Sequence, residues 1–194
     1  FGSMEMSKTI TKMSDNYGDA KAAVNDLERL GVPHNDISII AKDGDEGETR
    51  AAEDAGKGAT TGAAIGGVGG LLAGLGILAI PGLGPVVAAG WLVSTAVGAG
   101  VGALAGGAVG GLVGALQKEG VNEHDAHVYS EGVRRGGSLV SAKVSDDLAR
   151  QAESALDNHK AVDPVQRGAD YRARGWASFD AEAGRRQQRR HLTD

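Results

Sequence analysis

Apolar positions in the first forty residues alternate, then recur every three to four residues, and then alternate again. Lys8 to Ser14 alternates polar and apolar side chains, as a half-buried strand does. Asn16 is placed to cap a helix that ends just before Gly31. A second strand follows at Ile37–Ile40, so residues 8–42 predict a βαβ unit. The apolar face of the helix carries Ala20, Ala23, Val24, Leu27 and Leu30.

The same periods return after residue 121. Asn122 is placed to cap a helix that ends near Arg135, before two glycines, and a strand follows at Leu139–Val144. Ser145 begins another helix, and Ala161–Val165 is predicted as a short edge strand, where Pro164 is tolerated. Residues 121–165 therefore predict an αβαβ unit. The buried stripe of its second helix is formed by Leu148, Ala152, Ala155 and Leu156.

Together the two units predict an α+β fold with four strands and two main helices. We expect a ferredoxin-like split βαβ sheet, with the helices packed on one face. Residues 43–57 are acidic and lack an apolar period, so they are interpreted as a solvated linker. Residues 58–117 are then an insertion in this small domain, and residues 166–194 form an arginine-rich tail.

The insertion carries two runs of glycine at a strict four-residue spacing. It contains no charged side chain, and 19 of the 32 glycines lie in it. Each interior glycine costs a helix in water about 1 kcal/mol relative to alanine. A four-residue period places each run on one helix face, where another backbone can approach closely. The predicted packing positions are Gly58, Gly62, Gly66, Gly70 and Gly74, and Gly98, Gly102, Gly106, Gly110 and Gly114.

These runs predict a glycine-zipper helical hairpin. The segment Gly58–Gly74 has nine identities in seventeen positions with Gly98–Gly114, which indicates an internal duplication. No continuous helix can pass the segment between the two runs, so the chain is expected to reverse there. The predicted turn residues are Pro81, Gly82, Gly84 and Pro85.

The two predicted arms are long enough to cross a membrane. Gly58–Ile80 as a helix would span about 34 Å, against a hydrocarbon core of about 30 Å. Small residues every four positions are also what lipid-embedded helices use to pack. The charges that flank the insertion are mixed and give little orientation signal. A water-soluble oligomer, with the glycine faces meeting between protomers, remains an open alternative. In either case a single copy in water would expose a large apolar surface and is expected to associate.

Composition narrows the function classes. A net charge of −5 argues against a dedicated nucleic-acid binder, because phosphate contacts need concentrated Lys and Arg. The absence of cysteine excludes disulfides, thiolate metal sites and thiol catalysis. The glycine runs have neither the spacing nor the ending of a phosphate-binding loop. We therefore expect no enzymatic activity, no cofactor and no small-molecule substrate.

The second unit contains two groups of polar residues that could bind ions. His124, His127 and Glu131 are placed to line one side of a helix, a weak candidate for a divalent metal site. A capped, solvated helix explains the same residues, and we expect no metal there. Arg134 and Arg135, beside Gly136, would either meet an anionic group or place cations at the negative end of the helix.

The tail beyond residue 166 combines arginine with scattered aromatic residues. From Arg167 to Asp194 its net charge is +3, from seven Arg against Asp170, Asp180, Glu182 and Asp194. This charge is too small to predict nucleic-acid binding, and contact with another subunit or a membrane surface is preferred. Its apolar content is too low to form a core of its own.

Several of these segments resemble bacterial general stress proteins, a group that includes heat-induced and low-temperature-induced members. The resemblance is carried by the turn and strand Gly31–Ile40, the glycine-rich hairpin, the segment Glu131–Gly137 and the segment Tyr171–Trp176. It extends over about Lys8 to Phe179. It implies induction under stress and often a predicted membrane hairpin, and it brings no active-site residues.

The sequence therefore predicts a non-enzymatic stress-response protein that self-associates through its glycine-zipper hairpin. The preferred location is in or on the cytoplasmic membrane, on its cytosolic face, with other copies and membrane lipid as partners. Two alternatives remain open. One is a soluble, cytoplasmic scaffold oligomer without lipid contact, and the other is a metal- or ligand-binding sensor that uses His124 and His127.

Overall fold

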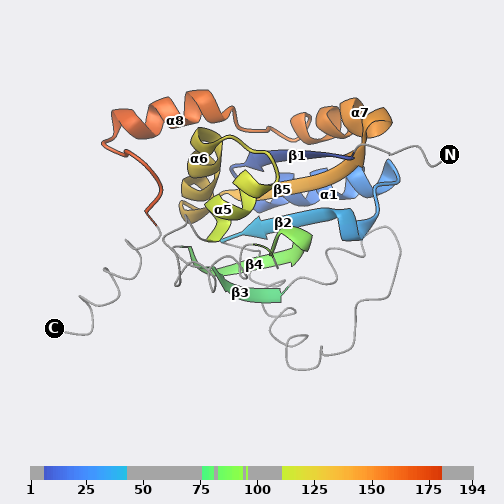
Figure 1. The fold of residues 1–194 in the computed structure, drawn as a ribbon, viewed down its shortest axis with the longest axis horizontal. Coiled ribbons are helices and arrows are strands. Elements are labelled where there is room, and N and C mark those ends of the chain that lie inside the picture. Colours follow the sequence, from blue (N-terminus) through green and yellow to red (C-terminus); the bar gives the residue numbers. More distant parts are fainter. Residues whose placement is uncertain (1–6, 43–75, 81–82, 94, 96–110, 181–194) are drawn as a thin grey trace.

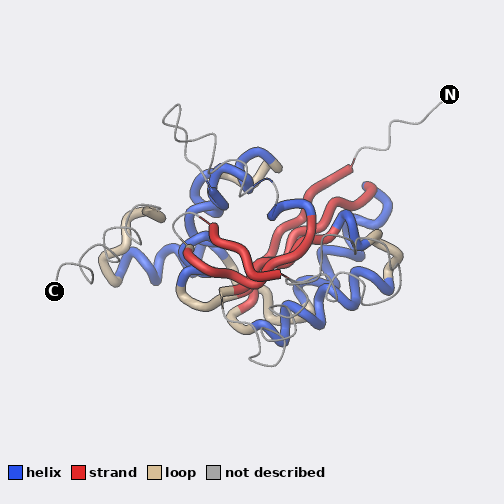
Figure 2. The backbone as a smooth tube through the Cα atoms, turned by 90° about the horizontal axis from the view of Figure 1, so that it is seen from below, coloured by secondary structure: helices blue, strands red, loops and turns tan. Residues whose placement is uncertain are grey.

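The fold is built on one five-stranded antiparallel sheet with the strand order β1-β5-β2-β4-β3 (Figure 1). It is seen in a computed structural model that describes residues 7–42, 76–80, 83–93, 95 and 111–180. Helices lie on both faces of the sheet, so the described residues form three layers (Figure 2). The α+β class expected from the sequence is therefore observed.

The first unit folds as its pattern predicts. Strand β1 spans Ser7–Ser14, helix α1 spans Tyr17–Arg29, and strand β2 spans Ile37–Ala41 after a short 3-10 helix, η1, at His34–Asp36. The Asn16 side chain accepts a hydrogen bond of 2.8 Å from the backbone N–H of Asp19, which caps α1. Gly31 follows the helix with a φ of +88°, the left-handed conformation that ends many helices.

The second unit provides the strand that joins the two halves. Helix α6 spans Glu123–Arg134, strand β5 spans Ser138–Ser145, and helix α7 spans Asp146–Asp157. Asn122 caps α6 by accepting from the backbone N–H of Asp125 at 2.9 Å. Strand β5 lies between β1 and β2 and is antiparallel to both, so the βαβ unit of the first half is split by a strand from the second half.

The predicted edge strand at Ala161–Val165 is wrong. Pro164 begins helix α8, which spans Pro164–Ala173, because the Asp163 side chain caps the N–H groups of Val165 and Gln166 and proline suits the first helical position. Before that helix, the Val162 N–H donates to the Met13 carbonyl at 2.7 Å. The chain therefore touches the outer edge of β1 and then turns away from it.

The insertion differs most from its prediction. Strand β3 spans Gly76–Ile80 and strand β4 spans Gly84–Gly90, so the two-helix interpretation fails for both segments. Strand β4 pairs antiparallel with β2, and β3 pairs with β4. The physical reason is that Val86 and Val87 favour strands, glycine disfavours helix, and β2 needs a partner on its second side. The sheet thereby extends to five strands where four were expected.

The end of the insertion is helical, as predicted. Helix α5 spans Gly111–Lys118 and packs on α6, and both cover the face of the sheet opposite to α1 and α7. The two main helices expected from the sequence, α1 and α7, do share one face, and α5 and α6 form a further helical layer on the other face. Strand β2 is buried at all five positions, as a central strand between two helical layers must be.

Two apolar cores follow the alternation of the strands. On one side, Ile10, Ile37, Ile39, Val87, Val140 and Ala142 pack against α1 and α7. On the other side, Met13, Ile40, Val86, Ala88 and Leu139 pack against α5 and α6. Neighbouring residues of one strand thus enter different cores, which fixes the register of every pair in the sheet.

Candidate functional site

The predicted packing glycines lie almost entirely outside the described residues. Of the ten positions, only Gly114 is described, and it is a half-buried residue of α5. The nine others are Gly58, Gly62, Gly66, Gly70, Gly74, Gly98, Gly102, Gly106 and Gly110. Their role in helix packing stays a prediction.

The chain reverses direction between β3 and β4. The Leu83 N–H donates to the Ile80 carbonyl at 3.0 Å, which closes a tight turn. Gly84 and Pro85 are the first residues of β4, while Pro81 and Gly82 lie outside the described residues. The reversal joins two strands here, and the two helical arms that were expected to meet at this point are not seen.

The structure gives His124, His127 and Glu131 three different environments. His124 contacts Asp125 and Arg172, His127 accepts from the backbone N–H of Phe179, and Glu131 is paired with arginines. Within the residues that the structure describes, no three His, Cys, Asp or Glu side chains are grouped to hold a metal ion. His124 therefore contacts α8, His127 contacts the segment after α8, and Glu131 binds the arginines at the end of its own helix.

Glu131 is the most deeply buried charged group among the described residues, and its side chain is only 1% exposed. Its Oε1 accepts from Arg134 and from Arg135, each at 2.6 Å, and its Oε2 accepts from Arg134 at 2.8 Å. Hydrogen bonding to Glu131 raises the pKa of Arg134. The Lys42 ammonium donates to the Arg134 carbonyl at 3.2 Å. The two arginines are thus committed to a buried carboxylate, which limits the anion-binding role considered for them.

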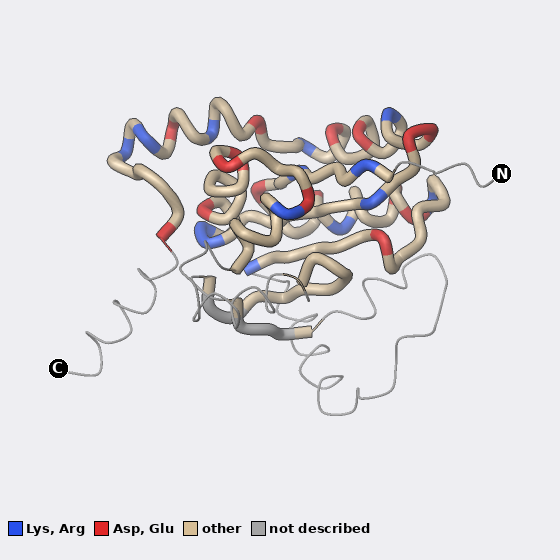
Figure 3. The backbone as a smooth tube through the Cα atoms, in the orientation of Figure 1, with Lys and Arg blue, Asp and Glu red and all other residues tan. Residues whose placement is uncertain are grey.

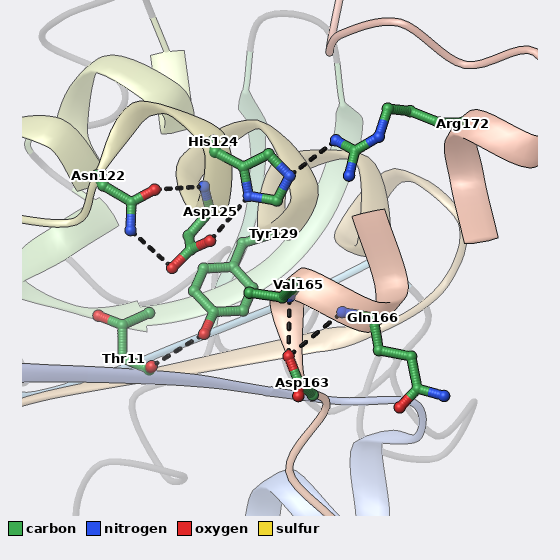
Figure 4. A network of polar contacts seen from close by, with 9 residues as sticks. All are labelled: Thr11, Asn122, His124, Asp125, Tyr129, Asp163, Val165, Gln166 and Arg172. Atoms are coloured by element: carbon green, nitrogen blue, oxygen red, sulfur yellow. Dashed lines mark hydrogen bonds and ion pairs between the residues drawn. The ribbon is translucent and has the colours of Figure 1, made fainter. Parts of the chain in front are cut away.

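A polar network joins the start of α6 to α8 and β1 (Figure 4). His124 lies between the Asp125 carboxylate, 3.0 Å from its Nδ1, and the Arg172 guanidinium, 2.8 Å from its Nε2. Tyr129 donates to the Thr11 carbonyl at 3.4 Å, and burial raises the pKa of its hydroxyl. A Cβ at Gly168 would lie 2.9 Å from the His124 ring, so glycine allows α8 to approach this closely.

The segment after α7 is held at its start by an exposed ion pair. Arg167 donates to both carboxylate oxygens of Asp15, at 2.6 and 2.8 Å, in a bidentate geometry. Further along, the Arg135 guanidinium lies 4.4 Å from the centroid of the Tyr171 ring. Tyr171 also meets Trp176 edge to face, with ring centroids 5.6 Å apart. The tail segment singled out in the sequence is therefore docked on α6 by its own aromatic and charged residues.

Two ion pairs, Asp15 with Arg167 and Asp26 with His159, make the free energy of unfolding depend on pH in the acid range. Hydrogen bonding to Arg167 lowers the pKa of Asp15, and hydrogen bonding to His159 lowers the pKa of Asp26. A lowered folded pKa stabilises the fold above the unfolded pKa, and this contribution is lost as pH falls through the folded pKa. We expect the free energy of unfolding to decrease below about pH 4.

Urea unfolding at a series of pH values measures this decrease. The variant Asp15→Asn should show a shallower decrease than the unmodified chain. Asp170→Asn, an exposed residue of α8, is the matched control and should leave the slope unchanged. Equal slopes in Asp15→Asn and the unmodified chain would show that the ion pair does not contribute.

An open groove of about 510 Å³ lies between α1 and α7. Its one acidic side chain, Asp26, already accepts from Arg29 at 2.8 Å and contacts His159 at 2.7 Å. Because these groups are paired with one another, we assign no ligand to the groove. It is lined by Asp26, Arg29, Leu30, Arg150, Gln151, Ser154, Ala155 and Asn158.

The described residues also bear on the membrane prediction. None of their helices combines the length and the apolar character needed to cross a bilayer. Charged side chains are spread over the helices of both outer layers, whereas β4 carries none (Figure 3).

Sequence reasoning missed the buried ion cluster and the close approach at Gly168. The spacing of Glu131 from Arg134 and Arg135, at i+3 and i+4, was a signal for the first, because such residues face one another on a helix. It could not show that the carboxylate would be buried. Gly168 carried no signal, because its role depends on a helix that was not predicted.

Residues 9–78 match the family model described as the heat induced stress protein YflT domain. The match includes β1 from its third residue, α1, β2 and the first three residues of β3. Over these residues it confirms the resemblance to bacterial general stress proteins that the sequence predicted, and the extension of that resemblance to Phe179 stays a prediction. Neither the curated proteins nor the solved structures gave a match to the chain.

Proposed function

We propose that this chain is a non-catalytic stress-response protein that self-associates through its glycine-rich middle segment, residues 58–117. A stress-response role is supported by the family match over residues 9–78. Self-association is supported by the two charge-free glycine runs, whose missing side chains let backbones come into close contact.

One structural observation carries the proposal. Strands β3 and β4 and helix α5 of the middle segment are built into the same packed body as the flanking units. Strand β4 pairs with β2, and α5 packs on α6. The chain between residues 42 and 76 and the chain between residues 95 and 111 therefore each begin and end at the same folded body. A self-associating segment that is joined to a folded domain at both ends brings whole domains together. This property suits a scaffold better than a catalyst.

Substituting a zipper glycine tests the proposal. Gly66→Leu or Gly106→Leu should reduce the oligomer to single chains, because a bulky side chain holds the backbones apart. Gly67→Leu and Gly107→Leu are matched controls, since the neighbouring position points about 100° away around a helix. Light scattering on the purified chain, with and without detergent, gives the mass. An unchanged mass in both zipper variants would contradict the proposal.

The same measurement separates the two environments. Assembly in water without detergent indicates the soluble scaffold. Recovery only with detergent or in the membrane fraction indicates that the middle segment associates within or on lipid. The glycine contacts are expected in both environments. The environments differ in whether protein or lipid covers the Leu, Ile and Val side chains of the segment.

A further inference from the structure

The C-terminal strap, defined here as residues Pro164–Phe179, lies along α6 and packs on it through few side chains. Gly168, Tyr171 and Phe179 are buried, whereas most other residues of the strap are exposed. Among the described elements, α8 has its main contacts with α6. The polar contacts along this interface add to the burial of Tyr171 and Phe179 in holding the strap on α6.

Two of these contacts need a histidine that is uncharged. An arginine can only donate, so the Nε2 of His124 accepts from Arg172 at 2.8 Å, and Nδ1 carries the proton that faces Asp125 (Figure 4). The Nδ1 of His127 accepts from the backbone N–H of Phe179 at 3.2 Å. Nε2 of His124 and Nδ1 of His127 therefore each offer a lone pair to the strap. Protonation of either nitrogen removes its lone pair.

Charged groups lie around both imidazole rings. Asp125 on α6 faces Nδ1 of His124, and Arg172 on α8 faces Nε2 of the same ring. His127 has Glu123 and Glu131 one helical turn away on either side, and Glu131 is neutralised by its arginines. Asp180 follows the strap directly in the sequence.

We propose that His124 and His127 form a pH-sensitive latch that releases the second half of the strap, residues 168–179, on acidification. Imidazole is the side chain that generally changes its charge between about pH 5 and pH 8, so acidification over this range is the condition under which the latch is tested. Protonated His124 repels Arg172, and protonated His127 cannot accept from Phe179. This inference stands apart from the glycine-rich segment and goes beyond the proposed self-association.

The release is partial because other anchors do not depend on these rings. Arg167 stays paired with Asp15, whose pKa is lowered, and the Val162 N–H stays bonded to the Met13 carbonyl. The strap would therefore swing from its start. Its departure uncovers the part of α6 on which Gly168 and Tyr171 pack, including Val128 and Gly132.

Hydrogen exchange of the full chain, read by peptide mass spectrometry and corrected for the intrinsic pH dependence of exchange, tests the latch. Between pH 8 and pH 5, protection of residues 168–179 should fall about tenfold for each histidine, which is about 1.4 kcal/mol each. Peptides from α1 and β5 should keep their protection. Unchanged protection of residues 168–179 would overturn the proposal.

Matched variants identify the titrating groups. His124→Gln and His127→Asn place an uncharged amide oxygen near the position of the accepting nitrogen, so the double variant should keep the strap closed at pH 5. His159→Asn, whose ring contacts Asp26 and not the strap, is the control and should open like the unmodified chain. If the double variant does not fold, each single variant should remove about half of the response on a logarithmic scale. An undiminished response in variants that fold would overturn the latch.

Discussion

Replacing Gly90 with alanine should destabilise the protein by at least about 2 kcal/mol. Gly90 has a φ of +98°, a conformation that residues with a side chain rarely adopt. A Cβ at this position would overlap the Ile37 carbonyl oxygen and lie 2.6 Å from the Ser38 Cα. Both obstacles belong to the backbone of the neighbouring strand, so no side-chain rearrangement relieves them. Chemical denaturation of Gly90→Ala measures the loss.

The matched control is Gly76→Ala at the start of β3. A Cβ there meets no atom within 4 Å, and its φ is not in the left-handed region, so its effect should stay within about 0.5 kcal/mol. The two variants also distinguish a strand from a helical arm at Gly90. If Gly90 belonged to a helical arm, alanine would stabilise it by about 1 kcal/mol. An increase in stability would therefore contradict strand β4.

Removing both arginines beside Glu131 should cost about 3–5 kcal/mol, because it leaves a buried carboxylate without a partner. The double variant Arg134→Met and Arg135→Met keeps most of the apolar stems while it removes the three charge-assisted hydrogen bonds. Either single variant should cost clearly less, since one guanidinium remains bonded to the carboxylate. Urea denaturation curves of the three proteins at pH 7 supply the comparison.

The control for this experiment removes two arginines that are exposed. Arg150→Met with Arg174→Met should change stability by no more than about 0.5 kcal/mol for each site. A similar loss in both double variants would mean that net charge, and not the buried ion cluster, sets the effect. A loss below about 1 kcal/mol at Arg134 and Arg135 would show that Glu131 reaches water.

The flanking units could be predicted because their signals are local. Asn16 and Asn122 precede amphipathic stretches and cap the helices that follow, as their positions indicated. Strands β1, β2 and β5 appear where apolar residues alternate or gather in short runs. Each of these elements is decided by neighbours within a few residues, so the pattern alone was sufficient.

The insertion was mispredicted because its fate depends on distant partners. Gly76–Ile80 and Gly84–Gly90 have the apolar, glycine-rich character of a packed helix and of a buried strand alike. Pairing with β2 decides between them. One clue was available, since β2 is apolar at all positions but Ser38 and therefore needed partners on both sides.

The end of the second unit illustrates a different limit. Ala161–Val165 has the composition of a short strand, and Val162 does reach the edge of β1. The Asp163 cap and Pro164 favour a helix start instead, and this local signal is stronger than the strand-like composition. The sequence places the two histidines on α6, but only the docked strap shows which atoms they face.

The central claim is that the insertion is built into the sheet by β4, and one engineered disulfide tests it most directly. The chain has no cysteine, so Ile40→Cys with Ala88→Cys introduces a single possible bond. These residues are directly opposite in the β2–β4 register and enter the same core, and such pairs lie within disulfide range.

Mild oxidation should link this pair within one chain, as shown by peptide mapping. The control pair, Ile39→Cys with Ala88→Cys, points to opposite faces and should stay reduced. Efficient formation of the first bond and not of the second is the result that this structure predicts. Two free thiols in the Ile40/Ala88 variant, or equal bonding in both variants, would contradict it.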